Sequence, residues 1–166
     1  PNKQIVFIPD CNLGSWCEEQ VPDKDFVLVD GGCPVHMLIT EDDVKSMKAA
    51  YPHAELLVHP EVTAEVRKYA GYIGSTTGIM KYAQESKNKE FIIGTENSIV
   101  QHLQFMCPDK AFYPLSKETV CHNMTLTTLM DVYYAVAGKG GEVIDLDDQV
   151  RIEALRPIEK MVELGG

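Results

Sequence analysis

The chain has 166 residues, of which 45% are hydrophobic and 24% are charged, and its formal net charge is -10. This length and composition suit one substantial domain or two small ones and exclude a disordered or fibrous chain. No apolar run approaches the roughly 18 residues that span a bilayer, and an acidic chain without a Lys/Arg cluster excludes nucleic acid as a partner.

Short β-rich runs alternate with helical patterns along the chain, which predicts an α/β fold with mainly parallel strands. The predicted strands are 5–8, 26–29, 56–58, 72–73, 91–93, 111–113 and 143–144. The predicted helices are 40–51, 62–69, 77–84, 98–105, 126–137 and 147–164. Pro157 lies inside the last pattern and predicts a kink or two helices there.

The clearest helix begins at Thr40, because Asp43 follows three residues later in an arrangement like a capping box. Its spacing places Val44, Met47 and Tyr51 on one face, and the next residue, a proline, stops it.

Three strands run into polar or glycine-rich corners that precede helices, at residues 9–14, 74–78 and 94–97. In parallel sheets such corners lie at the carboxyl ends of the strands, where ligands bind and helix N-termini favour anions. The alternative is that they are ordinary strand-to-helix turns. Local sequence leaves both interpretations open.

Five cysteines occur without a CxxC pair or an export signal, so disulfides are not expected. Each cysteine taken alone is best interpreted as a small buried hydrophobe. Cys33 and Cys121 differ in context: Cys33 follows a strand and two glycines, and Cys121 precedes a helix whose N-terminus would favour a thiolate. Their spacing alone supports no metal site.

Two further motifs could carry chemistry. His59-Pro60-Glu61 places an imidazole and a carboxylate at a strand end, where they could exchange protons or orient a substrate. Ser75 and Thr76 lie between glycines at a helix start, which suits a carboxylate or phosphate but lacks the lysine of a nucleotide loop. The structural alternatives are a proline that opens a helix and a hydroxyl that caps one.

Read together, these motifs resemble quinolinate synthase in order and spacing over essentially the whole chain. They are Pro9-Asp10-x-Asn12-Leu13-Gly14, Gly32-Cys33-x-Val35-His36, His59-Pro60-Glu61, Gly74-Ser75-Thr76-x-Gly78-Ile79, Gly94-Thr95-Glu96 and Cys121-x-Asn123-Met124-Thr125-Leu126.

The resemblance implies three αβα sandwich units with parallel sheets, related by pseudo-threefold symmetry around the active site. Residues 1–39 would end the second unit, residues 40–112 would form the third, and residues 113–166 would pack on the first. The implied reaction condenses iminoaspartate with dihydroxyacetone phosphate to quinolinate, with loss of phosphate and water, in de novo NAD biosynthesis. The family's setting is the cytoplasm, with a functional link to L-aspartate oxidase.

The resemblance also implies a four-iron, four-sulfur (4Fe-4S) cluster held by three cysteines. Cys33 and Cys121 match two ligand positions. His36, His59 and Glu61 would be catalytic, and the last two would also bind substrate. For His36, the alternative is that it only supports the Cys33 loop. The hydroxyls that anchor a substrate carboxylate or phosphate would be those of Ser75 and Thr76, whereas Cys11, Cys17 and Cys107 match no ligand position.

The family's members are nearly twice as long, and this sequence begins at Pro1 with a strand directly after it. We therefore expect a fragment that lacks the third cysteine ligand, is inactive alone, and exposes apolar surface near its C-terminus or forms a homo-oligomer. The alternative is a non-catalytic anion-binding α/β module that uses the corner at residues 74–78. A weaker alternative is a lyase or aldolase, for which Lys81 is the nearest candidate lysine.

Overall fold

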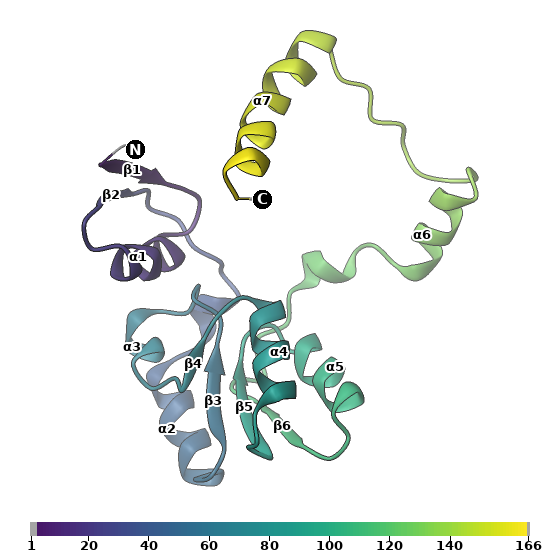
Figure 1. Ribbon diagram of the computed structural model, residues 1–166. Coiled ribbons are helices and arrows are strands. Elements are labelled where there is room, and N and C mark those ends of the chain that lie inside the picture. Colours follow the sequence, from purple (N-terminus) through teal and green to yellow (C-terminus); the bar gives the residue numbers. More distant parts are fainter. Residues whose placement is uncertain (1–2, 166) are drawn as a thin grey trace. The chain divides into compact units, whose positions relative to one another are not determined.

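The computed structural model describes residues 3–165, which divide into two compact units at residue 122 (Figure 1). The first unit contains β1 (Gln4–Phe7), α1 (Cys11–Gln20), β2 (Asp25–Leu28), the 3-10 helix η1 (His36–Leu38), α2 (Glu41–Ala50), β3 (Glu55–Val58), α3 (Ala64–Arg67), β4 (Tyr72–Ile73), α4 (Thr76–Glu85), β5 (Glu90–Gly94), α5 (Ser98–Met106) and β6 (Ala111–Pro114). The 3-10 helix η2 (His122–Thr125) lies at the boundary, and α6 (Leu129–Val136) and α7 (Asp148–Gly165) follow it.

The larger sheet of the first unit has the strand order β4-β3-β5-β6, and all its strands are parallel. In register, Val58 at the end of β3 pairs with Ile73 of β4 and Gly94 of β5. The three strands therefore end at one edge, and the loops that follow them, at residues 59–63, 74–75 and 95–97, begin side by side.

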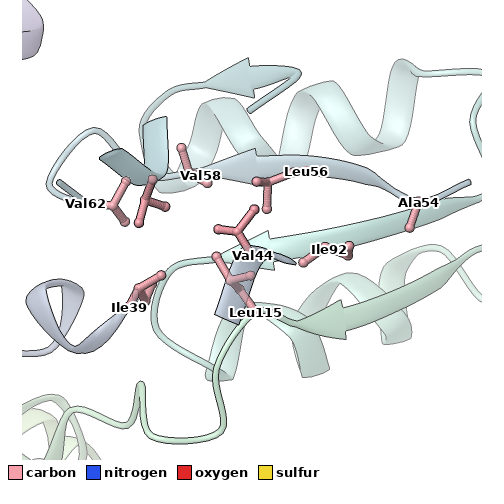
Figure 2. Packing of buried hydrophobic residues seen from close by; sticks show 9 residues of the cluster. Ile39, Val44, Ala54, Leu56, Val58, Val62, Ile92 and Leu115 are labelled. Atoms are coloured by element: carbon pink, nitrogen blue, oxygen red, sulfur yellow. The ribbon is translucent and has the colours of Figure 1, made fainter. Parts of the chain in front are cut away.

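Helices cover both faces of this sheet, because its central strands are apolar on both sides. Leu56 and Ile92 face one cluster, which contains side chains of α2 and α3, and Leu57 and Ile93 face the other, which contains side chains of α4 and α5. Figure 2 shows the first cluster, in which Val44 of α2 lies among strand residues. The sequence-based prediction of a parallel α/β fold is confirmed.

The smaller sheet pairs β1 with β2, also in parallel. Helix α1 lies close to it at Gly14, where a Cβ atom would come within 2.6 Å of Leu28 and 2.9 Å of Phe7. The outer positions of this sheet are open, since Val6 and Ile8 are 65% and 66% exposed.

The second unit carries its apolar side chains on the surface. None of its described residues is buried, and Leu129 and Val136 of α6 are among its exposed apolar side chains. The Thr128 hydroxyl and the Asp131 carboxylate form a capping box at the start of α6, so its helical form is fixed locally.

Most predicted elements are confirmed within one or two residues, including the capping box of Thr40 and Asp43. One prediction is wrong, and two others are confirmed only in part. Residues 143–144 form no strand, since β-propensity alone does not hold a strand that has no partner. Helix 62–69 is reduced to α3, because the Val62 amide donates to the His59 carbonyl in a turn before it. Residues 148–165 form one helix that contains Pro157, so the alternative of two helices is wrong, and the expected kink stays a prediction.

Across residues 3–165, we find no helix with both the length and the apolar character that a bilayer crossing requires.

Candidate functional site

Four side chains from two separate loops meet beyond the carboxyl end of β3. The backbone amide of His59 donates to the Gly94 carbonyl, at 3.0 Å, which fixes the start of the 59–61 loop against β5. Glu61 reaches back from this loop toward His36, and its Oε2 lies 3.0 Å from His36 Nδ1. Cys33, His36 and Glu61 each present a possible ligand atom, and these three atoms lie within 4.8 Å of one another.

His36 is the centre of this group. Its residue is 8% exposed, its Nε2 lies 2.9 Å from the Thr95 hydroxyl, and its ring stacks on that of His59 at 4.7 Å between centroids. His36 is the first residue of η1, and the Thr95 hydroxyl that its ring contacts follows β5 of the larger sheet. A residue 59 positions away along the chain therefore orients this imidazole.

Burial sets the electrostatics of the two imidazoles. The pKa of His36 is lowered because burial disfavours its charged form, although the Glu61 carboxylate opposes this shift. Burial, together with the positive charge that His36 would carry, lowers the pKa of His59 to about 4. Both rings are therefore neutral at pH 7, the state in which an imidazole accepts a proton.

Asp10 positions the Cys33 loop. It is 4% exposed, its Oδ1 accepts from the Leu13 amide at the start of α1, and its Oδ2 accepts from the Cys33 amide at 2.7 Å. The same carboxylate thus caps a helix and holds the backbone of a candidate ligand. The sequence reveals the cap, but it gives no signal for the contact 23 residues away.

The corner with the two candidate anchoring hydroxyls adjoins the 59–61 loop, since the Gly74 amide donates to the Val58 carbonyl. Ser75 is the N-cap of α4, and its hydroxyl accepts from the Gly78 amide at 3.1 Å. Thr76 is the first residue of that helix. Both glycines are required by Tyr72, because a Cβ atom at either position would lie 2.6 Å from the tyrosine hydroxyl oxygen.

Cys121 is not part of the close group around Cys33, yet its segment is anchored to the same edge of the sheet. The Asn97 amide donates to the Thr119 carbonyl at 2.9 Å, and the Thr119 hydroxyl donates to the Asn97 side chain at 3.0 Å. The loop after β5 thus contacts His36 through Thr95 and the Cys121 segment through Asn97. Cys33 and Cys121 are both free and half-buried.

The other cysteines occupy different settings. Cys107, the C-cap residue of α5, is buried in the core cluster that contains side chains of α4 and α5. Burial raises the pKa of the Cys17 thiol on α1. Lys81 is exposed on α4, 4.0 Å from Glu85, a setting typical of a helix-surface pair.

Sequence reasoning missed Arg67, which is 4% exposed and joins α1 to the 59–63 loop. Its Nη1 donates to the carbonyl oxygens of Asn12, Pro60 and Val62, and its Nη2 donates to Ser15 and Glu19 on α1. Its position on a short helix is typical of a solvent-exposed arginine, so nothing in the local sequence predicts this role.

The chain is similar to known proteins along nearly its whole length. Residues 1–163 match the family model described as quinolinate synthetase A protein. The chain is 44% identical over 163 residues to a quinolinate synthase of Clostridium kluyveri and 38% identical over 164 residues to one of Thermodesulfovibrio yellowstonii. It is also 41% identical over 165 residues to quinolinate synthase 2 of Methanosarcina acetivorans.

These matches cover 98%, 99% and 99% of this chain but 54%, 54% and 53% of the respective relatives, so the chain spans about half the length of the curated relatives it matches. Because the family model extends over nearly every residue, the chain belongs to the quinolinate synthetase A protein family.

Proposed function

We propose that this chain supplies about half of the active site of a quinolinate synthase, which condenses iminoaspartate with dihydroxyacetone phosphate and releases phosphate and water. The observation that carries the proposal is the convergence of Cys33, His36, His59 and Glu61 at one sheet edge. A thiol, two neutral imidazoles and a carboxylate are the groups that a metal-assisted condensation and dehydration needs. Family membership supports the same reaction.

We further propose that Cys33 and Cys121 are two of the three ligands of a 4Fe-4S cluster, with the third outside this sequence. Thiolates are the usual ligands of such clusters. The residues fit, because both thiols are free and half-buried and both segments are anchored to the loop after β5. When bound, a cluster with one open iron position would supply a Lewis acid for a substrate oxygen or nitrogen.

His59, Glu61 and His36 then provide proton transfer. Joining an imine to a ketone phosphate and removing water moves protons between carbon, nitrogen and oxygen atoms, and a neutral imidazole can receive them. The Glu61 carboxylate, 3.0 Å from His36 Nδ1 and 3.8 Å from His59 Nδ1, stabilises the charge that either ring gains.

Ser75 and Thr76 are proposed to bind a substrate carboxylate or phosphate. The Ser75 oxygen already accepts the Gly78 amide, and its own O–H remains able to donate to an anion. The first turn of α4, a ten-residue helix, adds unpaired amides and positive partial charge. This local field offsets the overall charge of -10.

In the whole enzyme, we propose that residues 1–39 complete the second of three αβα units, residues 40–112 form the third, and residues 113–166 pack on the first. The exposed apolar side chains of α6 and of the β1 strand segment support this arrangement, since such surface is normally covered. A reducing cytoplasm, supply of iminoaspartate by L-aspartate oxidase, and homo-oligomer formation by this chain alone belong to the same proposal.

An anion-binding module without catalysis is the second candidate, favoured by the capped N-terminus of α4 beside the 59–61 loop. A module of this kind would tolerate serine at Cys33 and Cys121. The alternative lyase or aldolase would need a lysine at the site, whereas Lys81 is 73% exposed in its side chain and pairs with Glu85.

The test is anaerobic reconstitution of the full-length parent enzyme with iron and sulfide, followed by an assay for quinolinate. We expect one 4Fe-4S cluster and quinolinate formation in the parent and loss of both in Cys33→Ser and Cys121→Ser. Cys17→Ser, on α1, is the matched control and should retain both. A parent without a cluster, or ligand variants that keep both cluster and activity, would favour the binding module.

A further inference from the structure

The close group of Cys33, His36 and Glu61 contains a polar atom without a partner. His36 Nδ1 is buried and makes no hydrogen bond in the described structure, although Glu61 Oε2 lies 3.0 Å away. The approach of these two atoms is therefore close but is not aligned as a hydrogen bond. A buried nitrogen left in this state costs free energy unless another group binds it.

The donors and acceptors of His36 and Glu61 show which kind of partner their facing atoms lack. A neutral imidazole has one N–H and one lone pair, and an ionised carboxylate only accepts. With the ring proton on Nε2, facing the Thr95 hydroxyl at 2.9 Å, the Nδ1 lone pair faces the Glu61 carboxylate. Two acceptors at this separation are stabilised by a cation that both can bind.

We propose that Cys33, His36 and Glu61 form a binding site for a single divalent transition-metal ion of the zinc class. Thiolate, imidazole and carboxylate are all established zinc ligands. Three protein ligands leave the fourth tetrahedral position for water, as in open zinc sites.

The distances suit this ion. Tetrahedral Zn²⁺ with bonds of about 2.0–2.1 Å to nitrogen and oxygen places those two ligand atoms about 3.3 Å apart. His36 Nδ1 and Glu61 Oε2 are 3.0 Å apart, and Cys33 Sγ lies within 4.8 Å of a ring nitrogen of His36 and of a carboxylate oxygen of Glu61. Binding of the ion would draw Cys33 Sγ closer to the other two ligand atoms.

Two of the three proposed ligands, His36 and Cys33, are held by hydrogen-bonding groups that lie outside the ligand set. Thr95, which is 2% exposed, faces the second ring nitrogen of His36 and so directs Nδ1 toward the group. The buried Asp10 carboxylate holds the Cys33 amide at 2.7 Å. Contacts of this kind orient metal ligands and raise the affinity of the site.

The site goes beyond the proposed function and does not depend on it. Both the zinc-class ion and the proposed 4Fe-4S cluster require the Cys33 thiolate, so the two exclude each other. A chain that has bound Zn²⁺ at this position is therefore blocked from loading iron and sulfide there.

The test uses the 166-residue chain without an affinity tag, in reduced and metal-free form, titrated first with Co²⁺ and then with Zn²⁺. We expect one equivalent of Co²⁺ to give a thiolate-to-cobalt charge-transfer band and the visible bands of a tetrahedral ion, and Zn²⁺ to abolish both. Absence of a thiolate band at one equivalent would overturn the proposal.

Variants assign the ligands. Cys33→Ser should abolish the charge-transfer band, and Glu61→Gln and Thr95→Val should each weaken binding at least about tenfold. Cys17→Ser and the exposed Glu65→Gln are the matched controls and should leave the affinity unchanged. A band that persists in Cys33→Ser, or that falls equally in Cys17→Ser, would place the ion elsewhere and refute the site.

A measurement on the unmodified chain avoids any folding defect of the variants. Zn²⁺ should protect Cys33 from alkylation by iodoacetamide, mapped by peptide mass, while Cys17 reacts at the same rate with and without the ion. Equal alkylation of Cys33 in both conditions would contradict the proposal.

Discussion

Replacing Arg67 by methionine removes a buried guanidinium that joins α1 to the 59–63 loop. Its five hydrogen bonds run to three carbonyl oxygens and to two side chains of α1. Methionine has similar length and fills much of the space, so the perturbation removes mainly the charge and the donors.

The expected cost follows from the groups left behind. The carbonyls of Pro60 and Val62 lose a donor at buried positions, and each unsatisfied buried group costs about 1–3 kcal/mol. The ion pair with Glu19, at 3.2 Å, adds little because Glu19 is 53% exposed. Burial of the Arg67 charge costs desolvation energy in the wild type, and the substitution removes this cost. It offsets part of the penalty from the unsatisfied carbonyls, so we expect a loss of about 3–4 kcal/mol in the free energy of unfolding.

Urea unfolding of the 166-residue chain, followed by circular dichroism, measures this loss as a shift of the midpoint at constant slope. Arg67→Lys should lie between wild type and Arg67→Met, because one ammonium group cannot reach both α1 and the loop. The matched control is Arg151→Met on α7, where an exposed arginine lies 2.9 Å from Asp148 and should change stability by less than about 0.5 kcal/mol.

The reasoning is refuted if Arg67→Met changes the free energy of unfolding by less than about 1 kcal/mol, or by no more than Arg151→Met does. Hydrogen exchange adds a local readout. The Val62 amide, which donates to the His59 carbonyl at 3.1 Å, should exchange faster in Arg67→Met because the loop loses its anchor.

Three further predictions concern local contacts. The Tyr69 hydroxyl and then Lys68 lower the pKa of Glu41 to about 2, so this carboxylate contributes stability above pH 4.5 that is lost as the pH falls toward 2. Tyr69→Phe should raise that pKa toward 4.5 in an NMR titration, and an unchanged value would contradict the assignment. Gly78→Ala should destabilise the chain because its Cβ meets the Tyr72 hydroxyl oxygen at 2.6 Å, yet in a Tyr72→Phe background it should stabilise α4 by about 0.5–1 kcal/mol in urea unfolding. If Gly78→Ala also destabilises the chain in the Tyr72→Phe background, the clash is disproved. Thr40→Ala should cost about 1 kcal/mol in the same assay by removing the cap of α2, and a neutral result would show that the cap is dispensable.

Much of the fold is predictable because its signals are local. The apolar runs that became β3 and β5 are long enough and sufficiently flanked by turn residues to be identified in sequence. The cap at Thr40 also depends only on residues three positions apart. The strand predicted at 143–144 failed because a strand also needs a neighbour, which no local pattern supplies.

The candidate site divides in the same way. The local sequence singled out Cys33, His59 and Glu61 as residue types in suitable corners, and it placed the corners at strand ends. The family resemblance added His36. Neither accounted for Asp10 under Cys33 or Thr95 beside His36, and both missed Arg67 entirely. Those contacts span 23, 59 and up to 55 positions along the chain.

The sequence by itself determined which segments become strands and helices, where they begin, and which family the motifs resemble, because these depend on neighbouring residues and on ordered spacing. Only the tertiary structure decided that His36 Nδ1 faces Glu61 and that the buried Arg67 joins the 59–63 loop to α1. The physical reason is that parallel strands bring loops that are distant in sequence to one sheet edge. Only where these loops meet are their polar side chains buried against partners from other segments.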